Sequence, residues 1–473
     1  MNRPIRAVAV VALLMSFALL ANLSFNYLAR QDSLNAQSGN RRVQDANFAQ
    51  DRGAILVGNK AVAETVAVKD RFKFQRKYSD GKLYAPITGF YSYQYGATGL
   101  EQGYSQELAG NDSSQLIGRL VNLATGTKPK GASVQTTIDA GAQKAAAQAL
   151  GGLKGAVVAL NPKTGAILAM VTSPSFDPNA IATHDLADAT AAWNTLRDDK
   201  SKPLANRATR EIFPPGSTFK TVVAAAALEA GYEPDTLVRA DSVKLPGTNV
   251  TIPGSCGGTK ITLTQALAVS CNPAFARLGM ELGADALREQ AEKFGFGTRF
   301  LPDLGNSAAS RFPEDPDKPQ TAMSAIGEFE VAATPLQMAM VAGAVANGGV
   351  VMQPYVVESV RSADLQVLSQ TRPQQSSVAM SSTNAFKLRQ MMLEVVQNGT
   401  GRRAQITGVT IGGKTGTAHS DNVRAPYAWF IAFADDPSVA VCVFVQDAEM
   451  ETSDIAGGRV AAPIARAVIE ALR

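Results

Sequence analysis

The sequence predicts an α+β protein whose main domain is an antiparallel sheet with helices packed on it. Two pairs of apolar, strand-like runs lie near opposite ends of this domain, with mostly helical sequence between them. A third observation is an almost wholly apolar N-terminal segment. We therefore expect a cytoplasmic tip and transmembrane segment over residues 1–30, a small membrane-proximal domain over 31–130, and the main domain over 131–473.

The composition excludes two classes of protein. With 473 residues, 45% hydrophobic and 18% charged, the chain can bury a large core and is not an intrinsically disordered protein. The net charge of +4 comes from 45 basic and 41 acidic residues, so nothing points to a nucleic-acid partner.

The apolar segment "AVAVVALLMSFALLANLSF" (Ala7 to Phe25) predicts a single helix across the plasma membrane. Arg3 and Arg6 precede it and no arginine lies inside it, which places the N-terminus in the cytoplasm and the chain after about Arg30 outside the cell. A cleaved signal peptide is the alternative. The length of the run, and the lack of a small-x-small site after it, favour an uncleaved anchor.

The membrane-proximal domain is predicted to be small and rich in β-structure. After a polar stretch over residues 30–51 come short strand-like pieces, "AETVAV" and "GFYSYQYG", broken by turn sequences. The segment "GTKPKG" at 126–131 marks the expected boundary, because the apolar patterns beyond it are longer and more regular.

The main domain opens with a helix that Asp139 can cap and Gly151 can end. Next, "GAVVALNPKTGAILAMVTS" predicts a hairpin with Lys163-Thr164-Gly165 in its turn. Near the C-terminus, "AWFIAFADDPSVAVCVFVQDA" predicts two further strands, and an alanine-rich helix follows over 457–473. There is no internal repeat.

The strongest chemical signal is "FPPGSTFKTVVAAAALEAGYEP", in which a helix is expected to start at about Ser217. Residues three apart share a helix face, so Ser217 and Lys220 can meet. A serine hydroxyl needs a base to become a nucleophile, and a buried lysine beside another cation can be neutral enough to serve. The helix N-terminus would favour the developing negative charge.

Ser-x-x-Lys alone is a weak pattern, because "SDGK" (Ser79 to Lys82) matches it too. That copy contains Asp-Gly, a turn signal, and we expect no stable helix there.

The second signal is Ser270-Cys271-Asn272, which lies between two helical runs in "LTQALAVSCNPAFARLG". A loop at this place could direct the Ser270 and Asn272 side chains into a cleft. The triplet Ser-x-Asn also starts at Ser24, Ser33, Ser38, Ser382 and Ser420. Even the literal "SDN" at Ser420 only follows a strand in a polar segment, so we interpret it as accidental.

The third signal is a second Lys-Thr-Gly in "TIGGKTGTAH". Lys414 and the hydroxyls of Thr415 and Thr417 offer a cation and donors for a carboxylate. Glycines at 412, 413 and 416 weaken a strand unless another backbone lies close alongside, and a substrate peptide pairing with the strand edge would supply one.

Together, Ser-x-x-Lys, Ser-x-Asn and Lys-Thr-Gly form the set known from penicillin-binding proteins and class A β-lactamases. The chain resembles the class B penicillin-binding proteins, most closely the penicillin-binding protein A type of actinobacteria. Further segments carry the resemblance over nearly the whole length: "GATGLEQGYSQELAG", "LNPKTGAILAMVTSPSFDPN", "LANRATREIFPPGSTFK" and "ATPLQMAMVAGAVANGGV".

The resemblance implies the serine penicillin-recognising transpeptidase fold over residues 131–473, with a five-stranded antiparallel sheet, helices on both sides and an all-helical lobe. It also implies a small β-rich pedestal before that domain, which is comparable to a dimerisation domain, and a D,D-transpeptidase that cross-links peptidoglycan stem peptides and is acylated by β-lactams. A β-lactamase of the same fold and a non-enzymatic β-lactam sensor or division scaffold are the alternatives. Implied partners are stem peptides, β-lactams, the plasma membrane, a membrane glycan polymerase and division proteins, with no cofactor.

The resemblance also implies a role for each motif residue. Ser217 would be the nucleophile, Lys220 its general base, and Ser270 a proton relay to the leaving amine. Asn272 would hold Lys220 and the substrate amide. The terminal carboxylate would lie on the strand of Lys414, Thr415, Gly416 and Thr417, and the backbone N–H groups of Ser217 and Thr417 would form the oxyanion hole. One departure is "GEFEVAATPLQ", with Glu328 and Phe329 where relatives often carry Gln and Gly.

The cysteines and histidines leave smaller questions. A disulfide between Cys256 and Cys271 is one interpretation outside the cell, and two buried thiols are the other. Cys442 lies in a run typical of a buried strand. No metal site is expected, because the only histidines are His184 and His419 and no ligand types cluster. His419 is more readily a solvent-facing loop residue than a ligand contact.

Overall fold

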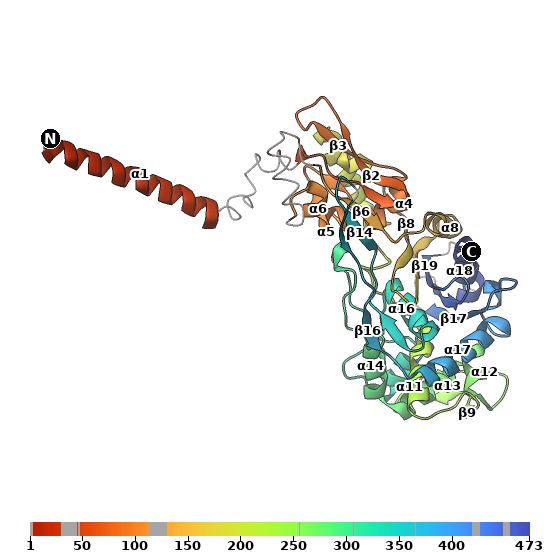
Figure 1. Cartoon of the computed structure of the whole chain (residues 1–473). Coiled ribbons are helices and arrows are strands. Elements are labelled where there is room, and N and C mark those ends of the chain that lie inside the picture. The colour runs from red at the N-terminus through yellow and green to blue at the C-terminus, as the bar shows by residue number, and fades with distance from the viewer. Residues whose placement is uncertain are drawn as a thin grey trace.

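The computed structural model describes residues 3–29, 45, 48–112, 130–254, 256–305, 307–364, 366–418, 426–447 and 455–473. Its first element is α1 (Arg3–Ala29), a single long helix (Figure 1). The span Arg3–Asn26 has a mean hydropathy of 2.3 and no buried residues. By length and composition α1 fits one membrane span, as the sequence predicts.

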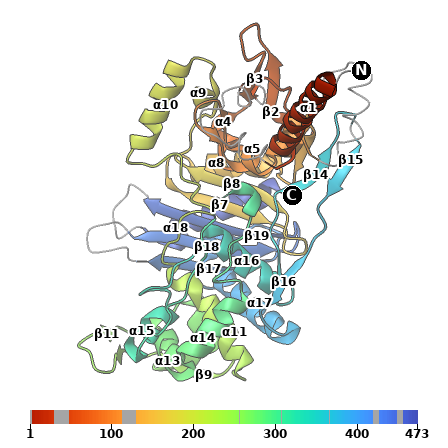
Figure 2. The ribbon, with the colours of Figure 1, turned by 90° about the vertical axis from the view of Figure 1, so that its left-hand side faces the viewer.

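The membrane-proximal part is built around a six-stranded sheet in the order β15-β14-β6-β1-β2-β3. Its strands come from both sides of the predicted boundary at residue 130, because β14 returns from far downstream to pair with β6, and β15 pairs with β14 (Figures 1 and 2). The strands are β1 (Ile55–Val57), β2 (Lys60–Ala67), β3 (Phe74–Tyr78), β6 (Ser133–Thr136), β14 (Val357–Arg361) and β15 (Val367–Gln370).

Short elements fill the space beside this sheet. A helix does begin at Gly81, so the expectation that "SDGK" could not hold one is wrong. Asp80 adopts a left-handed conformation just before it, which leaves Ser79 outside the helix. The short elements are α4 (Gly81–Thr88), β4 (Tyr91–Ser92), β5 (Gly96–Ala97), α5 (Gly99–Gly103) and α6 (Ser105–Ala109). Most of the "GTKPKG" segment lies outside the described residues.

The main domain contains the five-stranded antiparallel sheet that the resemblance implies, in the order β17-β18-β19-β7-β8. The two strand pairs lie far apart in the chain, and β19 joins them by pairing with β7. The strands are β7 (Lys154–Leu160), β8 (Ile167–Ser173), β17 (Ile411–Ala418), β18 (Tyr427–Ala434) and β19 (Val439–Asp447). The strand β17 forms one edge of the sheet.

Helices cover both faces of this sheet, which explains why β7, β8, β18 and β19 are largely apolar rather than alternating. On one face, α8 (Ala140–Leu150) and α18 (Gly457–Ala471) pack against alternate residues that include Phe430 and Val443. On the other face, α16 (Pro335–Ala346) packs against the intervening residues, among them Ile431 and Cys442. The predicted caps of α8 are confirmed, since Asp139 accepts a hydrogen bond from the Ala142 N–H and Gly151 follows the last turn.

A helical lobe lies below the five-stranded sheet in Figure 2, on the side opposite the six-stranded sheet. It contains α11 (Lys220–Glu229), α12 (Leu263–Ala268), α13 (Asn272–Leu282), α14 (Ala284–Lys293), α15 (Lys318–Ala325) and α17 (Ser382–Gln397). The remaining described elements are α9 (Asn179–Ala182), α10 (Leu186–Asp198), η2 (Gly216–Phe219), β9 (Leu237–Arg239), β10 (Val243–Lys244), β11 (Thr251–Ile252), β12 (Lys260–Thr262), η3 (Pro302–Leu304), β13 (Val350–Met352), β16 (Gln375–Val378) and η4 (Arg402–Ala404).

Candidate active site

Ser217 lies in a single 3-10 turn, η2, that connects directly to α11. The regular helix starts at Lys220 and not at Ser217. Gly216, the first residue of η2, has a φ of 52°, and its N–H donates to the Gly327 carbonyl at 3.0 Å. A Cβ on Gly216 would lie 2.7 Å from the Thr417 carbonyl oxygen, so the turn sits against the free edge of β17. Ser217 is half-buried and lines a groove together with Thr415 and Thr417 of this strand.

Lys220 is fully buried, and its ammonium group is bonded to the loop after α12. It donates to the Ser270 carbonyl oxygen at 2.7 Å, to Asn272 Oδ1 at 2.5 Å and to Ser270 Oγ at 3.3 Å. No hydrogen bond between Lys220 and the Ser217 hydroxyl is present among the described residues. The Lys220 ammonium group is thus hydrogen-bonded to Ser270 and Asn272 in this structure, while Ser217 lies three residues before it in the chain.

Burial lowers the pKa of Lys220 well below its ordinary value of 10.5, and the positive charge of Lys414 lowers it further. Glu328 acts in the opposite direction through its negative charge. The free amine is the form that can accept a proton, so this environment favours Lys220 as a base.

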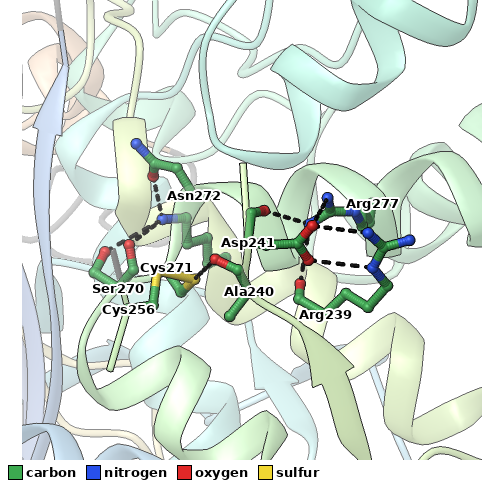
Figure 3. Close-up of a disulfide and its surroundings, with 9 residues drawn as sticks. Arg239, Ala240, Asp241, Cys256, Ser270, Cys271, Asn272 and Arg277 are labelled. Carbon is green, nitrogen blue, oxygen red and sulfur yellow. Dashed lines mark hydrogen bonds and ion pairs between the residues drawn. A yellow bond between two sulfur atoms is a disulfide. The ribbon is translucent and has the colours of Figure 1, made fainter. Parts of the chain in front are cut away.

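Ser270 is held in an unusual backbone conformation between α12 and α13, with a φ of 59°. This conformation turns the Ser270 carbonyl toward Lys220, while Asn272 begins the next helix. Next to both, the sulfur atoms of Cys256 and Cys271 are bonded across a Cα–Cα distance of 5.6 Å (Figure 3). Of the two interpretations of these cysteines, the structure contains the disulfide, which ties the loop before β12 to the residue between Ser270 and Asn272.

Lys414 lies on β17 with an exposed fraction of 0%. Its ammonium group donates to Ser270 Oγ at 2.8 Å and to the Thr415 carbonyl at 2.9 Å. Burial lowers the pKa of Lys414 from 10.5 to about 7. Lys414 therefore lies in the same cluster as Ser270 and Lys220, but it is not among the described residues that line the groove.

The glycines of β17 accommodate the protein's own groups. A Cβ on Gly412 would lie 2.2 Å from the Phe433 ring on β18, and one on Gly416 would lie 2.8 Å from the Pro215 carbonyl oxygen. Gly412 and Gly416 therefore admit an aromatic ring and the turn that carries Ser217. The expectation that a substrate peptide pairs with the edge of this strand stays a prediction.

The groove has a volume of about 610 Å³ and brings the three motifs together. Thr415 and Thr417 of β17 lie along one wall, and the Thr415 hydroxyl is hydrogen-bonded to the Thr400 hydroxyl at 2.7 Å. Residues described along its lining are Ser217, Ser270, Asn272, Gly399, Thr400, Arg402, Arg403, Thr415, Thr417, Ala456, Gly457, Gly458 and Arg459.

The groove residues outside the three motifs were not identified from the sequence, and those with polar side chains among them are Thr400, Arg402, Arg403 and Arg459. They come from η4, from the turn before it and from the start of α18. The only local signal was the arginine pair after "NGTG", eight residues before β17 begins. Nothing in the sequence showed that this turn lies beside Thr415.

The other residues that the sequence analysis named are not part of this groove, or lie outside the residues that the structure describes. Ser420 and His419 are outside the described residues. Cys442 is buried in β19, as its sequence context predicts. His184 pairs with Asp70, and the described part of the chain holds no group of three or more metal-ligand side chains.

Comparison with known proteins reveals similarity along the whole chain. The family description "Penicillin binding protein transpeptidase domain" matches residues 155–470, and "Penicillin binding protein A dimerisation domain" matches residues 52–134. The peptidoglycan D,D-transpeptidase PbpA of Mycolicibacterium smegmatis is 43% identical, with 100% of this chain and 99% of the relative covered. The PbpA of Mycobacterium tuberculosis is 41% identical over the same shares.

Solved structures agree. The ceftriaxone acyl-enzyme complex of penicillin-binding protein A from M. tuberculosis superimposes with a TM-score of 0.87 at 40% identity, covering 90% of this chain and 99% of that one. Apo penicillin-binding protein 3 from M. tuberculosis is more distant, with a TM-score of 0.74 at 26% identity and coverage of 89% and 95%.

Proposed function

The chain belongs to the penicillin-binding protein transpeptidase family, and from this premise we infer that it is a peptidoglycan D,D-transpeptidase whose acyl-enzyme forms on Ser217. Its substrates are the stem peptides of peptidoglycan, and β-lactams acylate and inhibit it. The observation that carries the assignment of residues is the cluster of Lys220, Ser270, Asn272 and Lys414 beside the turn of Ser217.

In the acylation step, Ser217 Oγ attacks the carbonyl carbon between the two terminal D-alanines. The new bond joins Oγ to this carbon, and the bond from the carbon to the nitrogen of the last D-alanine breaks. Lys220 accepts the proton from Ser217, since its environment favours the free amine. Ser270 Oγ lies within hydrogen-bond distance of both lysines, so the proton can pass through Ser270 to the departing amine.

Charge that develops on the substrate oxygen is met by backbone donors. The N–H groups of Ser217 and Thr417 are proposed as the oxyanion hole, because the turn of η2 packs against β17 at this point. Lys414 orients Ser270 and the Thr415 carbonyl, and the hydroxyls of Thr415 and Thr417 receive the terminal carboxylate. Asn272 holds Lys220 from the other side.

In the second step, an amine of a neighbouring stem peptide attacks the acyl carbon. Its nitrogen forms the new amide bond, and the bond to Ser217 Oγ breaks. The amine gives up a proton through Ser270 and Lys220, and Ser217 regains one. The enzyme returns to its starting state with one cross-link formed.

The test is covalent labelling by a fluorescent penicillin. The full chain in detergent is expected to take up one label and keep it for many minutes, and Ser217→Ala should abolish labelling. The control is Ser79→Ala, since Ser79 lies outside α4 and far from the groove. Labelling that survives Ser217→Ala would show that another residue is the nucleophile.

The same experiment separates the rival functions. A β-lactamase would release hydrolysed drug rapidly and lose the label. A sensor or scaffold would bind without needing turnover, so a Ser217→Ala allele would restore growth and shape to a deletion strain. We expect that allele to fail.

The location and wider partners belong to the proposal too. A single span through α1 would keep the N-terminus in the cytoplasm and the groove outside, where the cell wall is assembled. A membrane glycan polymerase and division proteins are the proposed partners beside it. Protease treatment of intact spheroplasts checks the orientation, because only an outward-facing main domain would be digested.

A further inference from the structure

The exposed positive charge of the groove does not come from its lysines. Lys220 and Lys414 are fully buried, and each points its ammonium group at protein oxygen atoms. Neither lysine lies on the groove surface, although Thr415, the neighbour of Lys414, does. A carboxylate that reached Thr415 and Thr417 would therefore meet two hydroxyls, while the amino group of Lys414 is buried behind them.

Two arginines place positive charge on the surface of the groove, which the buried lysines do not. Arg402 and Arg403, both exposed, form the start of η4 and line the groove near Thr400, whose hydroxyl holds that of Thr415 at 2.7 Å. Their recorded bonds go to backbone carbonyls, from Arg402 to Asn398 at 2.7 Å and from Arg403 to Arg459 at 3.4 Å. Neither makes an ion pair with any described carboxylate, so their charge stays available to a ligand.

No aspartate or glutamate is among the described residues that line this groove. A second groove of about 480 Å³ shares Arg402 and Arg403, so the pair stands between two hollows and is reachable from both. Guanidinium groups favour carboxylates because they can donate two parallel hydrogen bonds.

We propose that Arg402 and Arg403 are specificity-determining residues that recognise the terminal carboxylate of the peptide donor at the end of the groove beyond Thr415. This proposal rests on the proposed function, because it takes the donor as the ligand of the groove of Ser217. The hydroxyls of Thr415 and Thr417 fix the position of the carboxylate, and the two arginines provide the charge that distinguishes it from a neutral group.

The test compares two thioester donors that differ only in this group. One is acyl-D-alanyl thioglycolate with a free carboxylate, and the other is its carboxamide; thiol release measures acylation of Ser217. In the full-length wild type the acid is expected to have the higher kcat/KM. In the double variant Arg402→Ala/Arg403→Ala, kcat/KM for the acid should fall about 10- to 100-fold, while the value for the carboxamide changes less than about threefold.

Two controls make the result specific. Arg466→Ala removes an arginine from the neighbouring groove, where Arg466 pairs with Glu470 at 2.9 Å, and should leave the acid preference unchanged. Arg402→Lys/Arg403→Lys should restore part of the preference, and raising the salt concentration should reduce the preference of the wild type.

The outcomes separate this proposal from the one on which it rests. An unchanged acid preference in the double alanine variant overturns the role of the arginines, and so does an equal loss for both donors, which would indicate a structural effect. Thiol release that persists in Ser217→Ala would instead overturn the proposed nucleophile, whatever the arginine variants do.

Discussion

The two Lys-Thr-Gly tripeptides have identical letters and opposite structural roles. Lys163-Thr164-Gly165 forms the turn between β7 and β8, where Asn161 Oδ1 accepts hydrogen bonds from the N–H groups of Lys163 at 2.9 Å and Thr164 at 3.3 Å. Lys414-Thr415-Gly416 lies inside β17, and the Lys414 ammonium group bonds to Ser270, a residue 144 positions away.

The difference shows what a short motif needs in order to do chemistry. The first tripeptide is held by its neighbours in sequence, and the Lys163 side chain is exposed. The second is held by segments from elsewhere in the chain, which bury its lysine and bring it to the cluster around Lys220. Four predictions follow this contrast from the largest expected effect to the smallest.

Replacing the lysine of each tripeptide should give the largest difference in acylation rate between the two. Lys414→Ala is expected to slow acylation by penicillin about 100- to 1,000-fold, because Ser270 loses the donor that orients it. Lys163→Ala should change the rate less than about twofold. Stopped-flow or gel-based labelling rates check both, and circular dichroism verifies that the fold persists. Equal rates for the two variants would contradict the assignment of Lys414.

The burial of Lys414 predicts how its replacement depends on pH. Its pKa is about 7 in the folded protein against an ordinary 10.5, so between these values the unfolded chain binds a proton that the folded one does not. Folding stability therefore rises with pH over this window. The free energy of unfolding of the wild type should therefore rise relative to that of Lys414→Met, by up to a few kcal/mol between pH 7 and pH 10.

Urea unfolding of the full chain in detergent at several pH values measures this difference. Lys163→Met is the matched control, and its difference from the wild type should stay flat because the side chain lies exposed in a turn. A flat difference for Lys414→Met would mean that the lysine keeps its charge in the folded protein.

Substituting the glycine of the first tripeptide should affect stability alone, whereas substituting the glycine of the second should affect both stability and activity. In Gly165→Ala the new Cβ would meet the Gln353 carbonyl oxygen at 2.2 Å, at a φ of 84°, so a loss of about 1–3 kcal/mol of stability is expected with the acylation rate unchanged. Gly416→Ala would press on Pro215 and Thr218 around Ser217 and should lower both. Unfolding midpoints and labelling rates, measured together, decide whether the effects divide this way.

The smallest effect is expected at Asn161. Asn161→Ala removes the side-chain acceptor for the Lys163 and Thr164 N–H groups, which are near the surface and can bond to water instead. A loss of about 1 kcal/mol is expected, with acylation unchanged. A change in labelling rate without a change in stability would show that the first tripeptide does reach the active site.

The sequence by itself determined the features that depend on neighbouring residues. Asp139 and Gly151 mark the ends of α8, and the apolar runs predict β7, β8, β18 and β19. The three motifs were found in their right local settings for the same reason: caps, turns and periodicity involve residues within a few positions of one another. The fold class and the family resemblance rest on these patterns.

The tertiary structure alone decided what depends on distant segments. It buried Lys414, brought Lys220 to Asn272 and placed Arg402 beside Thr415. In the folded chain β14 and β15 belong to the membrane-proximal sheet, and an aromatic ring occupies the space over Gly412. The physical reason is that burial, and with it the charge of a lysine, depends on which surfaces pack together, and such contacts between segments tens to hundreds of residues apart leave no local pattern in the sequence.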